Sequence, residues 1–238
     1  MSRAMVVGLM AAAVMTGAAP ASAQDQILNV NLGYFALRGE ESRGDDDVLN
    51  ANRCIDTTFL CEPILFDVGD FNNATIGAEY LFGVTDYLEV GVGVGYYQRT
   101  VNSIYEFVAR PDDTEIEQDL KLRIVPITGT IRVIPTGRHS AFQPYAGAGI
   151  AALIWRYSEV GEFVDPVDFT IFRASFEADG TEIAPVFLGG VRFVGDAFVV
   201  GGEVRFQRAE GDLPTDDFLG ETIDLGGTTF QATFGVRF

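Results

Sequence analysis

Apolar residues alternate with polar or small residues along much of the chain, with the period of a β-strand and not of a helix. In the last segment, every second residue from Phe230 to Phe238 is apolar, and the residues between are Gln, Thr, Gly and Arg. Eight such segments can be found, at about 26–38, 71–83, 87–99, 119–133, 143–157, 182–194, 197–208 and 227–238. Each is close to the length of about nine to eleven residues that a tilted membrane strand needs.

Two of these segments need an interpretation of their own. In 119–133 the apolar positions change parity, because Leu122 and Ile124 lie on one parity and Ile127 and Ile131 on the other. A β-bulge near Pro126 would reconcile the two halves. In 143–157 the large apolar residues share one parity, and we expect them to point outward; they are Tyr145, Leu153, Trp155 and Tyr157.

The connections between the segments alternate strictly in length. The short ones are 84–86, 134–141 and 195–196, and the long ones are 39–70, 100–118, 158–181 and 209–226. Such alternation places the long loops at one end of an up-and-down barrel and the short turns, with both termini, at the other. The sequence therefore predicts an all-β fold: an eight-stranded antiparallel up-and-down transmembrane β-barrel over residues 24–238, with four long external loops.

The N-terminus has the pattern of an export signal. Arg3 precedes an apolar run from Met5 to about Ala19, and Ala21-Ser22-Ala23 forms a cleavage site. We predict a signal peptide over residues 1–23. No later stretch has the length of apolar sequence that a membrane helix needs, so the exported chain would be periplasmic, secreted or inserted in the outer membrane as a barrel.

The chain is strongly acidic, with a net charge of −18, and its only lysine is Lys121. The acidic residues gather in the four long connections, as in the run Asp45-Asp46-Asp47. This charge argues against nucleic acid as a partner, because phosphates require a basic surface. The carboxylates could bind Ca²⁺ or Mg²⁺, but their spacing matches no fixed calcium loop. A solvated acidic surface and a divalent-cation bridge to lipopolysaccharide phosphates both stay open.

With these features the chain resembles the small eight-stranded outer-membrane barrels, the OmpA/OmpX-like family. The resemblance rests on the strand count, the loop alternation, the stretch PYAGAG (Pro144–Gly149) and the terminal sequence GVRF (Gly235–Phe238). It implies a position in the bacterial outer membrane, contact with its lipids and lipopolysaccharide, and assembly by the barrel-assembly machinery. Phe238 would then be the terminal residue of the assembly signal.

A secreted lipocalin is the rival interpretation, because it is also an eight-stranded up-and-down barrel. In a lipocalin the apolar face points inward and the other face meets water. Here the polar face is mostly Gly, Ala, Thr and Asn, which suits a crowded interior. The apolar face carries more aromatic volume than eight strands can enclose, so the membrane barrel is favoured.

The polar face also carries charged residues that would lie inside the barrel. They are Glu79, Glu89 and Glu203, with Arg132, Arg192, Arg205 and Arg237. A buried charge has to be paired, and eight strands leave only enough room for side chains to fill the interior. We therefore predict a structural salt-bridge plug; a gated ion path through these charges is the alternative.

Two cysteines, Cys54 and Cys61, lie in the first long connection. An exported chain with two cysteines predicts a disulfide. A metal pair is the less favoured alternative, because no histidine or third cysteine is near. We predict no metal site and no cofactor.

The sequence contains few candidate catalytic residues. His139 and Ser140 are adjacent in a predicted periplasmic turn that contains no carboxylate to orient the histidine. We expect no catalytic residues, and a lipid hydrolase is the least supported function. Aromatic residues are expected at the two membrane interfaces: Tyr96, Trp155 and Tyr157 at the outer one, and either Tyr80 and Phe82 or Phe193 and Phe198 at the inner one.

The sequence thus favours a non-enzymatic envelope protein that acts in membrane integrity or surface interaction through acidic external loops. A narrow porin-like channel for small or hydrophobic solutes is the alternative.

Overall fold

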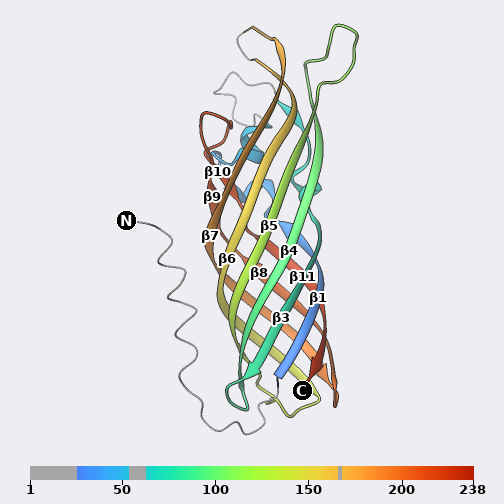
Figure 1. The fold of residues 1–238 in the computed structure, drawn as a ribbon, viewed down its shortest axis with the longest axis vertical. Coiled ribbons are helices and arrows are strands. Elements are labelled where there is room, and N and C mark those ends of the chain that lie inside the picture. The colour runs from blue at the N-terminus through green and yellow to red at the C-terminus, as the bar shows by residue number, and fades with distance from the viewer. Residues whose placement is uncertain (1–25, 54–62, 166–167) are drawn as a thin grey trace, which may run out of the picture.

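The computed structural model describes residues 26–53, 63–165 and 168–238. The predicted signal peptide and both cysteines, Cys54 and Cys61, lie outside the described residues. Eight long antiparallel strands form a closed barrel (Figure 1). They are β1 (Gln26–Leu37), β3 (Asn73–Gly83), β4 (Leu88–Tyr105), β5 (Glu117–Val133), β6 (Phe142–Val164), β7 (Ile171–Val194), β8 (Phe198–Gln207) and β11 (Gly227–Arg237).

Among the eight long strands, neighbours in the ring are neighbours in the sequence, apart from the one closure between β11 and β1. β11 pairs with β1, and β4 pairs with both β3 and β5. The resulting order is β4-β3-β1-β11-β8-β7-β6-β5, with β5 returning to β4. This pairing confirms the predicted eight-stranded antiparallel up-and-down barrel.

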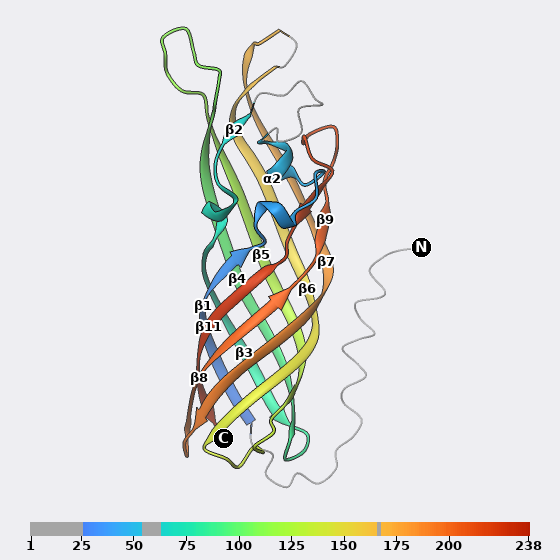
Figure 2. The same cartoon turned by 180° about the vertical axis from the view of Figure 1, so that it is seen from behind.

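The two ends of the barrel differ (Figure 2). The short turns and the C-terminus lie at the lower end, where the backbones of Gln26 and Phe238 hydrogen-bond to each other at 2.9 and 3.0 Å. The long connections lie at the upper end. They contain the short elements η2 (Glu40–Ser42), α2 (Val48–Ala51), β2 (Ile64–Leu65), η3 (Val68–Phe71), β9 (Glu210–Asp212) and β10 (Thr222–Asp224).

Four strands continue far above the others, and this was not predicted. β6 and β7 remain paired up to Val164 and Ile171, so most of the predicted loop 158–181 is strand, and the predicted loop 100–118 shortens to 106–116. We call this extension the protruding sheet: residues 98–105 of β4, 117–124 of β5, 155–164 of β6 and 171–182 of β7. The prediction followed outward apolar residues, whereas backbone pairing continues where charged side chains replace them.

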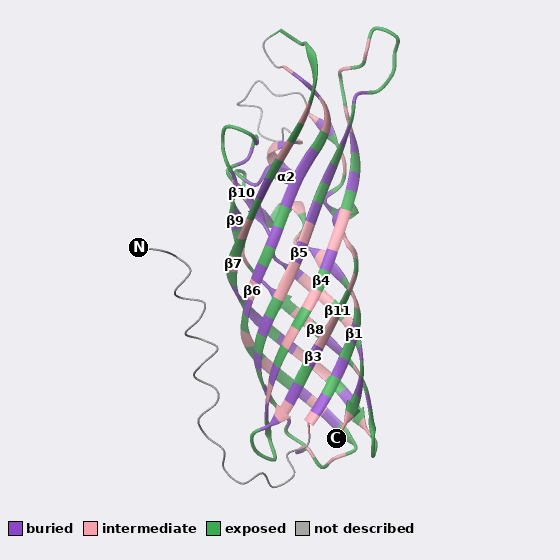
Figure 3. Ribbon diagram, in the orientation of Figure 1, coloured by how far each residue is buried: buried purple, intermediate pink, exposed green. Residues whose placement is uncertain are grey.

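A belt of apolar side chains surrounds the lower part of the barrel. Its exposed members include Leu28, Val30, Leu32, Tyr34, Ile76, Val92, Val94, Ile127, Ile131, Ile150, Ile154, Ile183, Phe187, Val200, Val204, Phe206, Phe230 and Phe234. Aromatic residues border its lower edge, where the ring centroids of Phe142 and Phe193 lie 5.3 Å apart and those of Tyr80 and Phe238 6.4 Å apart. Exposed and buried residues alternate along each strand of the belt (Figure 3).

The strand pairing of β5 contains no bulge. Its register is constant against β4, from Leu88↔Val133 to Ile104↔Glu117, and also constant against β6 through Pro126↔Leu153. The predicted bulge is therefore wrong. Even-numbered residues face inward along the whole strand, so Leu122 and Ile124 are buried inside the barrel. The apparent change of parity comes from an interior that is apolar above and polar below.

Among the described residues, no helix has both the length and the apolar character needed to cross a membrane.

Candidate functional site: the filled interior of the barrel

The lower interior holds six charged side chains contributed by five strands. We call them the ionic cluster: Glu79 of β3, Glu89 of β4, Arg132 of β5, Arg192 of β7, and Glu203 and Arg205 of β8. The two-residue period of each strand turns these residues inward while their neighbours join the belt. All but Arg205 have side chains at most 2% exposed. The three carboxylates balance the three guanidinium groups.

Arg132 is the centre of the first half of the cluster. Its Nη2 lies 2.5 Å from Oε2 of Glu79 and 2.9 Å from Oε2 of Glu203. Arg205 joins the same two carboxylates, with Nη2 at 2.8 Å from Oε1 of Glu203 and 3.3 Å from Oε1 of Glu79. Two acids and two bases thus form a closed ring of ion pairs, which offsets the cost of removing them from water.

Arg192 and Glu89 form the second half as a two-pronged pair. Nη1 and Nη2 of Arg192 donate to the two oxygens of Glu89 at 2.9 and 2.7 Å. Nε of the same arginine donates to Oε1 of Gln143 at 2.8 Å. With its guanidinium group held on both sides, Arg192 has one defined position.

Tyr145 connects the two halves. The guanidinium carbons of Arg132 and Arg192 lie 5.0 and 5.6 Å from its ring centroid, and its hydroxyl donates to Glu203 at 3.1 Å. Such cation–π contacts gain strength away from water. The expectation that Tyr145 points outward is therefore wrong: it is 5% exposed and lies inside.

Arg237 was predicted to belong to the same network. It lies near the C-terminal end of β11, opposite Ile27 of β1, and is half-buried. The structure brings the other six predicted residues together in the ion pairs described above.

A small polar cavity adjoins the ionic cluster. Its volume is about 50 Å³, and polar residues in its lining include Asn31, Glu79, Thr128, Arg205, Gln207 and Gln231. Oδ1 of Asn31 and Oγ1 of Thr128 are buried and have no hydrogen-bond partner among the described residues. Since a water molecule needs roughly 10–15 Å³ of such space and two to four polar partners, the cavity suits a few water molecules.

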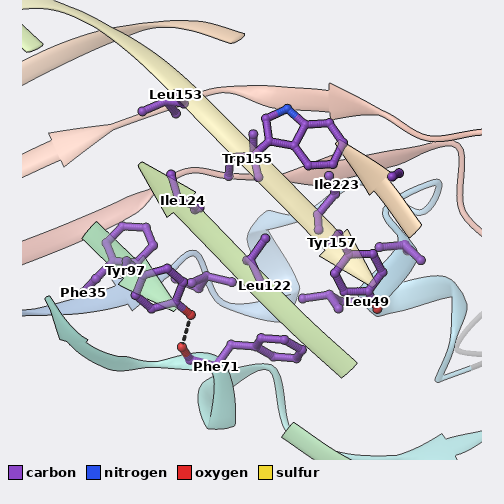
Figure 4. Packing of buried hydrophobic residues seen from close by; sticks show 14 of the residues in the cluster. Phe35, Leu49, Phe71, Tyr97, Leu122, Ile124, Leu153, Trp155, Tyr157 and Ile223 are labelled. Carbon is purple, nitrogen blue, oxygen red and sulfur yellow. Dashed lines mark hydrogen bonds between the residues drawn. The ribbon is translucent and has the colours of Figure 1, made fainter. Parts of the chain in front are cut away.

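The upper interior is apolar instead. Barrel strands and loop elements together fill it with buried side chains (Figure 4), among them Phe35, Leu49, Phe71, Tyr97, Leu122, Ile124, Leu153, Trp155, Tyr157, Ile223 and Leu225. Leu49 comes from α2, Phe71 from η3 and Ile223 from β10, so the long loops fold down into the barrel. The hydroxyl of Tyr97 donates to the backbone carbonyl of Phe71 and ties η3 to β4.

The placement of Trp155 and Tyr157 in the outer aromatic girdle is wrong. They are 2% and 0% exposed and belong to the upper interior. In β6 both parities carry apolar residues at this height, since Ile150 and Ile154 face outward, so hydrophobicity alone does not separate the faces. Tyr96, the third predicted member, is 45% exposed and faces outward at the upper edge of the belt.

Four charged residues anchor the loops over the apolar filling. Arg43 pairs with Asp47 through Nε at 2.7 Å and Nη2 at 2.9 Å, and Nη2 also donates to the carbonyl of Asp224 at 2.9 Å. Nη1 of Arg38 donates to Oδ2 of Asp224 at 2.6 Å. Asp47 also caps α2 by accepting from the N–H of Leu49 at 3.0 Å. We call Arg38, Arg43, Asp47 and Asp224 the loop anchor.

A buried carboxyl holds the end of α2. Glu159 lies in the protruding sheet, above the belt, and is 4% exposed. It accepts from Nδ2 of Asn52 at 2.6 Å and from the hydroxyl of Tyr157 at 2.8 Å. Burial raises the pKa of Glu159, although the two hydrogen bonds oppose this shift. Burial also raises the pKa of the Tyr157 hydroxyl.

The turn that contains His139 differs from its prediction in one respect. Nε2 of His139 lies 3.5 Å from Oδ1 of Asp86, so the neighbouring turn supplies a carboxylate that the sequence did not reveal. Both side chains are about three-quarters exposed, at 75% and 73%. The Ser140 hydroxyl donates to the backbone carbonyl of Phe142 at 2.9 Å.

Sequence reasoning missed the loop anchor, Tyr145 and Glu159. Asp47 had a usable signal, because an aspartate directly before the apolar pair Val48-Leu49 is typical of a helix N-cap. Glu159 had none, since it lies among other acidic residues and only its buried position sets it apart.

No protein-family model and no curated protein sequence matches the chain. The solved structures that it resembles are small outer-membrane β-barrel proteins. OprG of Pseudomonas aeruginosa is 13% identical, with 91% of this chain and 96% of that chain covered and a TM-score of 0.49. Ail of Yersinia pestis, solved with the heparin analogue sucrose octasulfate, is 13% identical, with 90% and 99% covered and a TM-score of 0.45. OmpW of E. coli is 18% identical, with 89% and 97% covered and a TM-score of 0.35.

Proposed function

We propose that the protein is a non-enzymatic outer-membrane barrel with a closed interior, and that its protruding sheet and loops form a recognition surface outside the cell. The belt supports the membrane position, because exposed apolar side chains on a closed barrel are stable only against lipid. The belt would contact outer-membrane lipids and lipopolysaccharide, and Phe238, which is 64% exposed, would be read by the barrel-assembly machinery.

The observation that carries this proposal is that side chains fill the barrel interior in both its lower part and its upper part. The ionic cluster fills the lower part, and the apolar residues with the folded loops fill the upper part. A solute crossing the barrel would have to break paired charges and also displace packed side chains. We therefore expect solutes to pass through the barrel slowly, because the lower interior and the upper interior each block the path.

The protruding sheet supports the second half of the proposal. A barrel that served only to anchor itself would not need β6 and β7 to continue past the belt as far as Val164 and Ile171. Above the belt the outward side chains are charged, as in the pairs of Arg156 with Glu177 at 3.1 Å and with Asp179 at 3.7 Å. These strands build a rigid, solvated surface instead of a mobile loop. Divalent cations would join its acidic loops to lipopolysaccharide phosphates.

Conductance of the refolded mature protein in a planar lipid bilayer tests the closed interior. The faster mobility of unboiled protein on a gel serves as the folding control. We expect no channel steps from folded protein. Discrete and reproducible steps would contradict the closed interior and favour the channel alternative, with the polar cavity as part of the water path.

A further inference from the structure

The protruding sheet has two side edges, and among the residues that the structure describes a further strand covers one of them and not the other. At the edge formed by β4, the short strand β2 adds two pairs, Ile64↔Tyr105 and Leu65↔Ile104. At the other edge, β8 pairs with β7 only over Val186–Val194. Within residues 26–53, 63–165 and 168–238, no strand pairs with β7 on that side between Ile171 and Pro185.

The register shows which backbone groups point out of this edge. At the two ends of the β6–β7 pair, the N–H of Val194 donates to the carbonyl of Ala141 and the carbonyl of Thr170 accepts from the N–H of Asp165. The backbone N–H and C=O groups of even-numbered residues of β7 therefore point toward β6. The register is constant between these ends, so odd-numbered residues turn their N–H and C=O groups to the open edge. The odd-numbered Gly195 agrees with this parity, because its N–H donates to the backbone carbonyl of Phe198 in β8 at 2.8 Å.

Between Phe172 and Gly180, four residues consequently present backbone donors and acceptors at the open edge: Arg173, Ser175, Glu177 and Asp179. No backbone partner for them exists on that side among the described residues. Their side chains are exposed on the outer face, whereas Ala178 between them is buried. An open strand edge of this kind accepts an added strand, which contributes backbone hydrogen bonds over its length.

The surroundings of the edge define the chemistry of that strand. The connection 209–226 follows β8, which pairs with β7, and contains no lysine or arginine. Its element nearest to β7 is β9, in which Glu210 and Asp212 are exposed. Its β9 reaches the inner side of β7, because Gly211 and Gly180 both lie against the Trp155 ring. On the same side, the Phe176 ring packs on Phe163 and Phe218 at centroid distances of 5.1 and 6.3 Å. The edge is thus acidic on its flank and apolar beneath.

We propose that the edge of β7 from Ile171 to Gly180 binds an extended, cationic segment of another protein by strand addition. The bound segment alternates apolar residues, which lie on the inner side with Phe176, with basic residues, which lie on the outer face beside the exposed carboxylates of Glu177 and Asp179. The inference rests on the proposed surface-recognition function and names the partner of that surface. A second copy of the chain in the same membrane is disfavoured, because its β7 runs in the same sense and does not offer the antiparallel pairing found in every other pair of this barrel.

Amide hydrogen exchange of the mature chain in lipid nanodiscs tests the edge directly. The probe is a peptide of about ten residues that alternates valine and lysine, and the control alternates valine and glutamate. In the free protein we expect fast exchange at Arg173, Ser175, Glu177 and Asp179, and slow exchange at the even-numbered residues between them. The lysine peptide should slow the odd-numbered amides by about tenfold or more, and added salt should weaken the effect.

A matched pair of variants separates backbone pairing from side-chain contact. Ser175→Pro removes an N–H at the open edge and leaves the hydrogen bonds to β6 intact. Ser175→Ala keeps that N–H and removes only the hydroxyl. We expect Ser175→Pro to lose binding of the lysine peptide by about fivefold or more, and Ser175→Ala to bind as the unmodified chain does. Gel mobility of unboiled protein verifies folding of both.

Several outcomes would overturn the proposal. These are slow exchange of the odd-numbered amides without peptide, equal binding of the glutamate peptide, unchanged binding by folded Ser175→Pro, and protection that depends on protein concentration alone. If Ser175→Pro does not fold, the exchange pattern of the unmodified chain decides. Channel conductance is measured separately, so a barrel that is closed but binds no peptide contradicts this inference and leaves the closed interior standing.

Discussion

The lower and upper interiors of this barrel are filled by opposite chemistry on the same strands. β5 contributes Arg132 to the ionic cluster below and Leu122 to the apolar filling above, and β6 contributes Tyr145 below and Trp155 above. All six side chains of the ionic cluster in the lower interior come from the strands. The upper interior also needs side chains from the loops, such as Leu49 of α2 and Ile223 of β10.

This difference shows how each half depends on geometry. Ion pairs are directional, so Arg132 stabilises the barrel only if β3, β5 and β8 hold their register. Apolar packing is much less directional and tolerates changes that keep volume and shape. The lower interior therefore defines the register of the ring, whereas the upper interior joins the loops to it.

The largest effect is expected from Arg132→Met. Removal of this guanidinium leaves the buried carboxylates of Glu79 and Glu203 with Arg205 as their one remaining shared partner in the ionic cluster, and breaking a buried ion pair costs about 3–5 kcal/mol. The free energy of unfolding in detergent with urea measures the loss. Arg156→Met is the matched control, since Arg156 is 43% exposed in its ion pairs and its loss should change stability by less than about 1 kcal/mol. Equal effects of the two substitutions would contradict a structural role for the ionic cluster.

A smaller effect is expected from Gly211→Ala in the upper interior. A Cβ at this position would lie 2.5 Å from Cζ2 of Trp155, a rigid ring with little room to move. Overpacking of this kind costs about 1–3 kcal/mol. Gly202→Ala is the control, because a Cβ there meets no atom closer than 3.9 Å. If thermal unfolding of the two variants is the same, the close packing of Trp155 by β9 is not maintained in solution.

Leu153→Met tests how well the apolar filling of the upper interior tolerates substitution. It introduces the same side chain as Arg132→Met does in the lower interior, so the two variants can be compared. Leu153 is fully buried among apolar neighbours, and a swap that conserves volume costs less than about 1.5 kcal/mol. Urea titration should rank this variant well above Arg132→Met in stability. A reversed ranking would show that the upper interior is the less tolerant half.

The smallest effect is expected from Glu159→Gln, and it should depend on pH. Burial raises the folded-state pKa of Glu159 above its ordinary value near 4.5, so the folded state binds the proton more tightly than the unfolded state. This contribution is fully present below the unfolded pKa and is lost as pH rises through the folded pKa. Glutamine keeps the neutral form, so the stability of Glu159→Gln relative to the unmodified chain should increase with pH above about 4.5. Unfolding midpoints measured across this range check the trend, and a constant difference would contradict it.

The contrast between the two halves also explains what the sequence could predict. Where the interior is polar, as at Glu79, Glu89 and Glu203, each strand alternates clearly and the inward residues can be identified. Where the interior is apolar, as at Leu122 and Trp155, both faces of a strand are apolar. The pattern of hydrophobicity then does not show which side chains point into the barrel. The predicted bulge at Pro126 and the outward placement of Trp155 and Tyr157 have this one cause.

Contacts between distant segments lay beyond prediction for a different reason. The loop anchor joins Arg43 to Asp224 across most of the chain, and no local spacing encodes such a pairing. The number of strands, their order and the alternation of short and long connections are local properties, which is why they could be predicted.

The length of β7 also sets how far from the lipid any contact would take place. The stretch from Ile183, at the upper edge of the belt, to Ile171 spans roughly 40 Å at about 3.3 Å per residue. At the tilt of roughly 35–45° that is common in such barrels, this is a height of about 30 Å along the barrel axis. Because one hydrogen-bond ladder runs from the belt to Ile171, the sheet resists bending. A segment bound by the proposed strand addition would therefore lie at a fixed height and a fixed angle to the cell surface.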